Sequence, residues 1–133
     1  MNNPSNLRFE QGLEKLKEID GQAGERVIDA LRTVCPDLGR YVIEFPFGDI
    51  YRRPGLDLQS REIATVAALT ALGTAGPQLE VHIHGALNVG CSPEQVTEVI
   101  LQMAVYAGFP AALNGMLIAK TVFTERGLLE VVE

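Results

Sequence analysis

Hydrophobic side chains recur every three or four residues along most of this chain, which is the period of an amphipathic α-helix. The clearest case follows the stretch SPEQ at positions 92–95. Ser92 can act as an N-cap, Pro93 suits the first helical position because an N–H there would have no partner, and Gln95 can close a capping box. A helix is therefore expected to begin after Ser92 and to end near Gly108. Its buried face would consist of Val96, Val99, Ile100 and Met103.

The same period predicts three more helices in the second half of the chain. One opens at Asp57 or Ser60 and ends at Gly73, where glycine suits the left-handed C-terminal position. The next covers residues 77–89, and the last runs from Phe109 to about Glu125.

The first half of the chain carries weaker helix signals. Apolar residues predict a helix around Phe9 to Leu16, which Gly12 weakens, a second around Val27 to Leu31, and a third that begins near Pro36. The stretch FPFGDIYRRPGLD at 45–57 contains two prolines and two further glycines, so it is predicted to be the one substantial loop. The expected fold is all-α, a single domain over residues 1–133 with about six to seven helices, of which the N-terminal ones lie within 6–46.

Charge narrows the choice of partners. The formal net charge is −6, and there is no basic tract of the kind that nucleic acids or anionic membranes require. No apolar run approaches the roughly 20 residues that cross a bilayer, and the N-terminus lacks the pattern of a signal peptide. We therefore expect a cytoplasmic protein that binds small molecules or other protein chains. A structural disulfide between Cys35 and Cys91 is not expected in that reducing compartment.

Three arginines gather around the predicted loop: Arg52, Arg53 and Arg61. They could be solvated or paired with neighbouring acids, which is the ordinary role of surface cations. They could also form a site for a carboxylate-bearing substrate, because a guanidinium group binds a carboxylate through two parallel hydrogen bonds. The sequence alone leaves both interpretations open.

The run LEVHIHGALNVG at 79–90 places two histidines two residues apart. On a helix such residues diverge by about 200°, so the two imidazoles cannot chelate one metal ion. His82 is expected to face the core or an enclosed pocket, either as a satisfied core residue or as an acid–base group. His84 is expected to be an exposed partner of Glu80, and spacing supplies no third or fourth ligand for a metal site there.

Three stretches in order resemble the carboxymuconolactone decarboxylase family: FGDIYRRPGLDLQSREIATVAALTALG, HIHGALNVG and EQVTEVILQMAVYAGFPAALNG. The resemblance covers about residues 47–127. It implies an all-helical domain of the alkylhydroperoxidase D-like type that assembles as a trimer or hexamer. One branch of the family resembles γ-carboxymuconolactone decarboxylase of aromatic catabolism. The other is similar to alkylhydroperoxidase D, which uses a Cys-x-x-Cys pair followed four residues later by histidine.

The redox branch does not match at its thiols. When its histidine is aligned on His82, the two cysteine positions fall on Ala75 and Gln78. Peroxide reduction by that route needs a thiolate and a nearby resolving thiol, and this chain has neither at the aligned positions. Cys91 remains a weak alternative nucleophile, because it has no second cysteine near it in the sequence.

The resemblance therefore favours a lyase that needs no cofactor or metal and that decarboxylates a small carboxylated lactone or related oxo acid. In this interpretation Arg53 and Arg61 bind substrate carboxylate and His82 donates a proton. Glu62 orients His82 across facing helices, because the redox branch carries a glutamate near this position. A thiol peroxidase and a non-catalytic, homo-oligomeric small-acid binding protein remain the alternatives.

Overall fold

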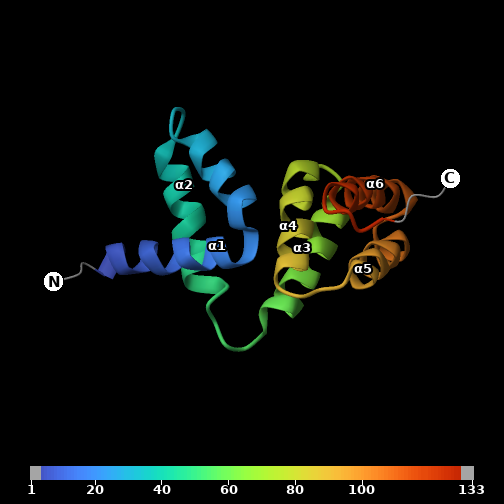
Figure 1. Cartoon of the computed structure of the whole chain (residues 1–133), viewed down its shortest axis with the longest axis horizontal. Coiled ribbons are helices and arrows are strands. Elements are labelled where there is room, and N and C mark those ends of the chain that lie inside the picture. Colours follow the sequence, from blue (N-terminus) through green and yellow to red (C-terminus); the bar gives the residue numbers. More distant parts are fainter. Residues whose placement is uncertain (1–3, 130–133) are drawn as a thin grey trace. The chain divides into compact units, whose positions relative to one another are not determined.

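The computed structural model describes residues 4–129, and these residues form helices and connecting turns without any strand. The all-α prediction is confirmed. The helices, in chain order, are α1 (Pro4–Leu31), α2 (Pro36–Val42), the π-helix η1 (Ile43–Ile50), α3 (Leu58–Leu72), α4 (Gly76–Asn88), α5 (Pro93–Tyr106) and α6 (Phe109–Glu125) (Figure 1). None of these helices is long and apolar enough to cross a membrane.

The chain divides into two compact units, one up to Leu58 and one from Gln59 onward. In the first unit, the two helices predicted before residue 32 are the two arms of α1. The arms meet at a bend at Gly21, whose φ of 53° and ψ of −134° lie where residues with a Cβ are strained. Figure 1 shows the two arms of α1 running in different directions on either side of this bend.

The sequence indicates that Gly12 weakens its helix, but in the structure this glycine allows close packing between two helices. It is buried, and a Cβ atom there would overlap the carbonyl oxygen of Ile43 in η1. Gly48 makes the reciprocal approach, since its Cβ would lie 3.0 Å from the carbonyl oxygen of Arg8. The two glycines therefore allow the backbones of α1 and η1 to pack directly against one another.

The prediction that residues 45–57 form one continuous loop is wrong for its first half. Residues 43–50 form η1, and only residues 51–57 lie between helices. Pro46 inside an α-helix would collide with the carbonyl four residues earlier, but the wider π-turn relieves that contact. The backbone N–H of Tyr51 accordingly donates to the carbonyl of Pro46, five residues back, at 2.8 Å.

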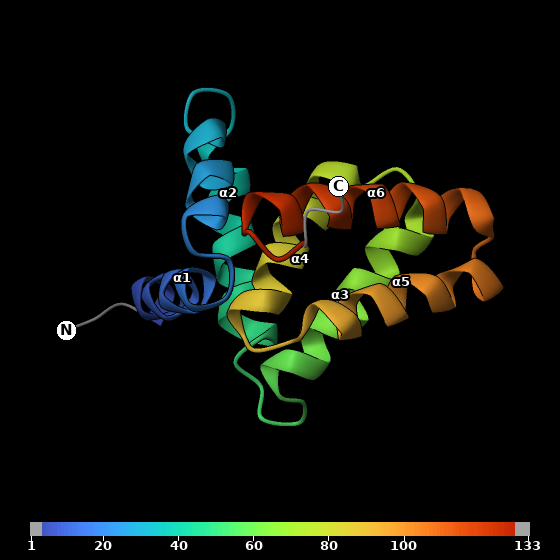
Figure 2. The same ribbon diagram turned by 45° about the vertical axis from the view of Figure 1, so that its right-hand side comes forward.

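The second unit contains α3 to α6, and its helices begin and end close to the predicted positions. The predicted capping box is present, because Ser92 Oγ accepts from the Gln95 N–H at 3.0 Å and Gln95 Oε1 accepts from the Ser92 N–H at 2.9 Å. Figure 2 shows α5 and α6 running back along one another from the turn that joins them. Gly108 in this turn is the N-cap of α6. The apolar core of this unit consists of Val66, Leu79, Ile83, Ala86, Cys91, Val96, Ile100, Ala119, Val122 and Phe123.

Candidate active site

Helices α3 and α4 bring a carboxylate and an imidazole together inside the second unit. Glu62 Oε2 lies 3.0 Å from His82 Nδ1, although the two residues are 20 positions apart in the chain. The Glu62 side chain has no exposed surface, whereas the His82 side chain keeps 19% of its surface accessible. The pair therefore combines a fully buried carboxylate with an imidazole that reaches toward the surface.

The helical repeat explains why Glu62 is buried. Glu62, Val66 and Thr70 follow one another at intervals of four residues, and all three lie on the buried face of α3. Burying a carboxylate costs free energy unless a partner compensates it, and the imidazole of His82 is that partner here. The second carboxylate oxygen, Oε1, is also buried and has no hydrogen-bond partner among the described residues.

This geometry sets what the imidazole can do chemically. A neutral imidazole has one donor and one acceptor nitrogen, and a carboxylate on Nδ1 selects the tautomer that carries its proton there. It also stabilises the doubly protonated imidazolium. The Glu62–His82 pair can therefore accept or deliver a proton through His82 Nε2, which is the arrangement of a general acid or base held by an orienting carboxylate.

The two arginines predicted to bind substrate occupy different settings. Arg61 is half-buried in the first turn of α3, next to Glu62 in sequence and so about 100° around the helix from it. Arg53 is exposed in the 51–57 segment of the first unit. The structure thus places Arg61 in the same unit as the Glu62–His82 pair, and the role of Arg53 stays a prediction.

Two other charged residues near this segment have partners within the first unit. Arg52 donates to Gln11 Oε1 at 2.6 Å, and Asp49 accepts from Arg8, with an Nη2–Oδ2 distance of 2.6 Å. The hydrogen bonds from Arg8 hold the pKa of Asp49 below its ordinary value. Arg52 and Asp49 therefore help to join η1 and its flanking segment to α1.

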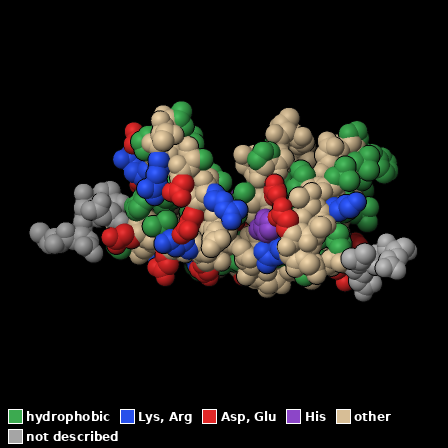
Figure 3. All heavy atoms as spheres, turned by 45° about the horizontal axis from the view of Figure 1, so that its top comes forward, with side chains coloured by type: hydrophobic (Ala, Val, Ile, Leu, Met, Phe, Trp, Pro, Cys, Tyr) green, Lys and Arg blue, Asp and Glu red, His purple; other side chains and the backbone are tan. Residues whose placement is uncertain are grey.

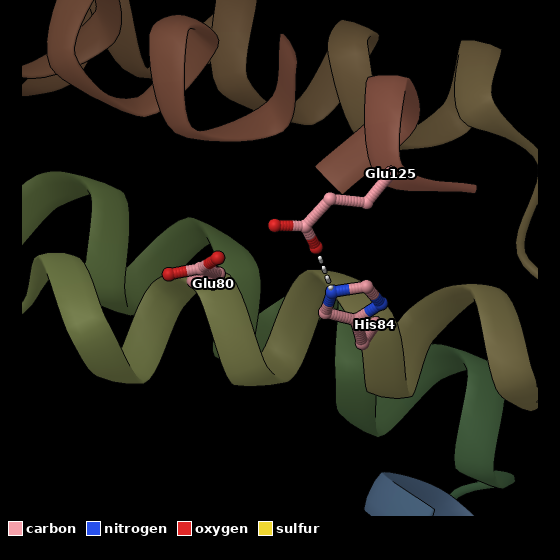
Figure 4. A group of neighbouring side chains, drawn as sticks. All are labelled: Glu80, His84 and Glu125. Carbon is pink, nitrogen blue, oxygen red and sulfur yellow. Dashed lines mark hydrogen bonds and ion pairs between the residues drawn. The ribbon is translucent and has the colours of Figure 1, made fainter. Parts of the chain in front are cut away.

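His84 lies on the opposite side of α4 from His82 and points toward α6 (Figure 4). Its Nε2 is 3.2 Å from Glu125 Oε2, and its Nδ1 is 3.2 Å from the guanidinium of Arg126. Glu125, rather than the predicted Glu80, is therefore its hydrogen-bonded partner. Glu80 is nonetheless close, because one ligand atom from each of Glu80, His84 and Glu125 lies within 4.8 Å of the others.

Sequence reasoning missed this second cluster because Glu125 is 41 positions from His84. Only the packing of α6 along α4 brings them together. The expected divergence of the two histidines is confirmed, since His82 contacts α3 and His84 contacts α6.

The two cysteines are free thiols in different environments. Cys35 is exposed at the start of α2. Cys91 is buried, and its Sγ lies 3.7 Å from the carbonyl oxygen of Gln59. At the positions where a redox pair is expected, Ala75 caps α4 and Gln78 lies in its first turn, so neither contributes a thiol.

Comparison with known proteins agrees with the resemblance noted in the sequence. The model of the Carboxymuconolactone decarboxylase family matches residues 36–121. The chain is 33% identical to 4-carboxymuconolactone decarboxylase of Acinetobacter baylyi over 122 residues, which are 91% of this chain and 90% of that protein. It is 30% identical to nitrosuccinic acid decarboxylase of Metarhizium robertsii over 120 residues, which are 88% of this chain and 82% of that protein. The chain belongs to the carboxymuconolactone decarboxylase family.

Proposed function

We propose that this chain is a decarboxylase that removes CO₂ from a small acid bearing more than one carboxylate, with His82 as the proton donor. The observation that carries the proposal is the 3.0 Å contact between His82 Nδ1 and the fully buried Glu62. Two relatives that match most of the chain are named as decarboxylases, which supports the same reaction class.

The names of these relatives indicate a common chemistry. A carboxylated muconolactone and nitrosuccinic acid both place a carboxylate near a group that can hold an electron pair, an unsaturated lactone in one and a nitro group in the other. When the C–CO₂ bond breaks, the electron pair moves into that group and CO₂ leaves. A new C–H bond then forms at carbon with a proton from an acid. The enzyme needs a positioned acid and a cation for the remaining carboxylate.

The roles that follow are specific to this chain. Arg61, in the helix that also carries Glu62, anchors a substrate carboxylate. Arg53 stays a second candidate for binding a substrate carboxylate, as its sequence context predicts. His82 delivers its Nε2 proton to the substrate carbon and recovers a proton from water. Glu62 keeps the imidazole oriented and stabilises its protonated form.

The test is CO₂ release by the purified protein from carboxymuconolactone, from nitrosuccinate and from related dicarboxylic lactones and oxo acids. At least one of these substrates should be decarboxylated, and His82→Gln should abolish most of that activity while the protein remains folded by circular dichroism. The matched control is Gln78→Asn, a small change on the same helix. Saturable binding of every acid without CO₂ release would support a binding protein instead.

The thiol peroxidase alternative has a separate test. Peroxide should not be reduced at an appreciable rate, because the aligned redox positions are Ala75 and Gln78. Rapid peroxide turnover that is lost in Cys91→Ser would overturn the decarboxylase proposal.

We also propose that the chain assembles as a trimer or hexamer through the end of the second unit where α5 meets α6. Large apolar side chains there remain exposed in the single chain, and Figure 3 shows hydrophobic surface over this part of the molecule. They are Leu101, Val105, Tyr106, Phe109, Leu113 and Leu117. Exposed apolar groups this numerous are typical of a surface that another subunit covers.

Light scattering at micromolar concentration should give a trimer or a hexamer. Leu113→Lys should shift the protein toward smaller species, whereas Thr121→Lys, an exposed site on the same helix, should not. A stable monomer would contradict the proposed assembly and leave the decarboxylase proposal to its own test.

A further inference from the structure

We propose that Glu80, His84 and Glu125 form a binding site for a divalent transition-metal ion of the Zn²⁺ type. The site joins α4 to the last turn of α6 and lies on the side of α4 that faces away from Glu62. It is separate from the proposed catalytic pair and is not needed for the decarboxylation steps described above.

The donor set fits such an ion. It offers one imidazole nitrogen and two carboxylate oxygens, ligands that Zn²⁺ and its neighbours in the first transition row prefer. The three ligand atoms lie within 4.8 Å of one another. Ligands at about 2.1 Å from a common ion are at most about 4.2 Å apart, so small side-chain rotations would bring all three into range.

Electrostatics at this site also favour a bound cation. Glu80 is half-buried, and its carboxylate makes no ion pair or hydrogen bond with any described residue. Figure 4 shows it on α4 beside His84, with the carboxylate of Glu125 approaching from α6. Two carboxylates held this close repel each other, and a divalent ion between them converts that repulsion into attraction.

Arg126 determines when the ion can bind. A guanidinium only donates hydrogen bonds, so its 3.2 Å contact makes His84 Nδ1 an acceptor and leaves the ring proton on Nε2. That proton is directed at Glu125 Oε2, 3.2 Å away. A metal ion bound to Nε2 replaces the proton there, so the neutral imidazole must carry its proton on Nδ1. The Nδ1–H group would then face the guanidinium of Arg126, which is also a donor. Metal binding and the Arg126–His84 contact therefore exclude each other.

Arg126 has an alternative partner when it leaves His84. Its Nη1 already donates to Asn88 Oδ1 at 3.1 Å. Replacing Arg126 by glutamine removes the competing cation and supplies a carbonyl oxygen that can accept from His84 Nδ1–H. Metal-bound histidines are commonly held by such an acceptor on the second ring nitrogen.

The experiment is calorimetric titration of the full-length chain with ZnCl₂ and CoCl₂, in a Cys35→Ser background that removes the exposed thiol. One ion per chain should bind at micromolar concentration or better. His84→Ala, Glu80→Gln and Glu125→Gln should each weaken binding by at least tenfold. Arg126→Gln should tighten it by about tenfold, since one competing contact is lost. Glu98→Gln, an exposed glutamate of α5, is the matched control and should have no effect.

Two further readouts separate a real site from adventitious binding. Zn²⁺ should raise the Tm of the parent chain and not that of His84→Ala, because an ion that binds only the folded state stabilises it. Bound Co²⁺ should show the visible absorption of a low-coordinate N/O site, and His84→Ala should lose it. Zn²⁺ binding that persists unchanged in His84→Ala, or no binding at millimolar Zn²⁺, would overturn the proposal.

Discussion

The two histidines of α4 are two residues apart and contact opposite neighbours. His82 meets a carboxylate with no exposed surface on α3, whereas His84 meets a carboxylate on α6 that keeps 54% of its side chain exposed. Both contacts have similar distances, 3.0 Å and 3.2 Å. Distance alone would rank these pairs as equals, and burial distinguishes them.

Burial matters because water weakens charge interactions and competes for hydrogen bonds. A buried carboxylate has few alternatives to its partner, so it holds the imidazole in one orientation. An exposed pair gains little over hydration and can exchange partners, which is what a reversible metal site requires. This difference in burial is why we propose proton transfer for the histidine on one face of α4 and ion binding for the histidine on the other.

The largest expected difference between the two histidines is in turnover. With a substrate that the chain decarboxylates, His82→Gln should lower kcat by roughly 10²–10⁴-fold, as expected for loss of a general acid. His84→Gln should change kcat by no more than a few-fold in metal-free protein. Steady-state CO₂ release by both variants measures this directly. Loss of turnover in His84→Gln with a nearly silent His82→Gln would reverse the assignment of the two faces.

A smaller difference is expected between the effects of removing Glu62 and removing Glu125 on the free energy of unfolding. Glu62→Ala should lower the free energy of unfolding by about 1–3 kcal/mol, because it removes the hydrogen bond between a fully buried carboxylate and the half-buried imidazole of His82. Glu125→Ala should cost less than about 1 kcal/mol, the usual range for exposed pairs. Urea unfolding in the absence of metal gives both values. Equal losses would mean that burial does not distinguish the pairs.

Removing the thiols should have little effect on turnover. Cys35→Ser combined with Cys91→Ser should keep decarboxylase activity within a few-fold, since neither thiol belongs to the Glu62–His82 pair. A serine at position 91 can still donate to the carbonyl of Gln59. A complete loss of activity in a folded protein would instead point to Cys91 as a nucleophile.

The smallest expected effect concerns an exposed pair in the first unit. Arg8 lowers the pKa of Asp49 in the folded chain. A carboxyl with a lowered folded pKa stabilises the fold above its unfolded pKa, and this contribution is lost as pH falls through the folded pKa. Arg8→Gln should therefore make stability fall less steeply on acidification below about pH 4. Urea midpoints between pH 2 and pH 6 would show this, and an unchanged slope would argue against the pair.

Local signals predicted the second unit well. The Ser92 capping box and the left-handed glycine at position 73, with φ of 72°, depend only on neighbouring residues, so the sequence contains them in full. The π-helix η1 was missed because Pro46 and Gly48 normally interrupt helices. The wider π-turn accommodates Pro46, and Gly48 packs closely against Gly12 and Arg8 of α1, which are distant in sequence.

The partners of His82 and His84 were likewise hard to predict from local sequence signals. Periodicity placed His82 and His84 on different faces, but it could not say which helix each face meets. The contact of Glu62 with His82 was expected from the family resemblance and not from spacing, since 20 residues and a helix reversal separate them. Glu125 and Arg126 carried no local signal, because their proximity to His84 arises only when α6 packs along α4.

The central claim is that His82 delivers the proton to the carbon that loses CO₂. Decarboxylation in D₂O tests it most directly, with the position and stereochemistry of the deuterium in the product read by NMR. The native chain should place deuterium on one face of that carbon only. His82→Gln should give slow residual turnover with deuterium on both faces, because water then supplies the proton. Deuterium on a single face at an undiminished rate in His82→Gln would contradict the account.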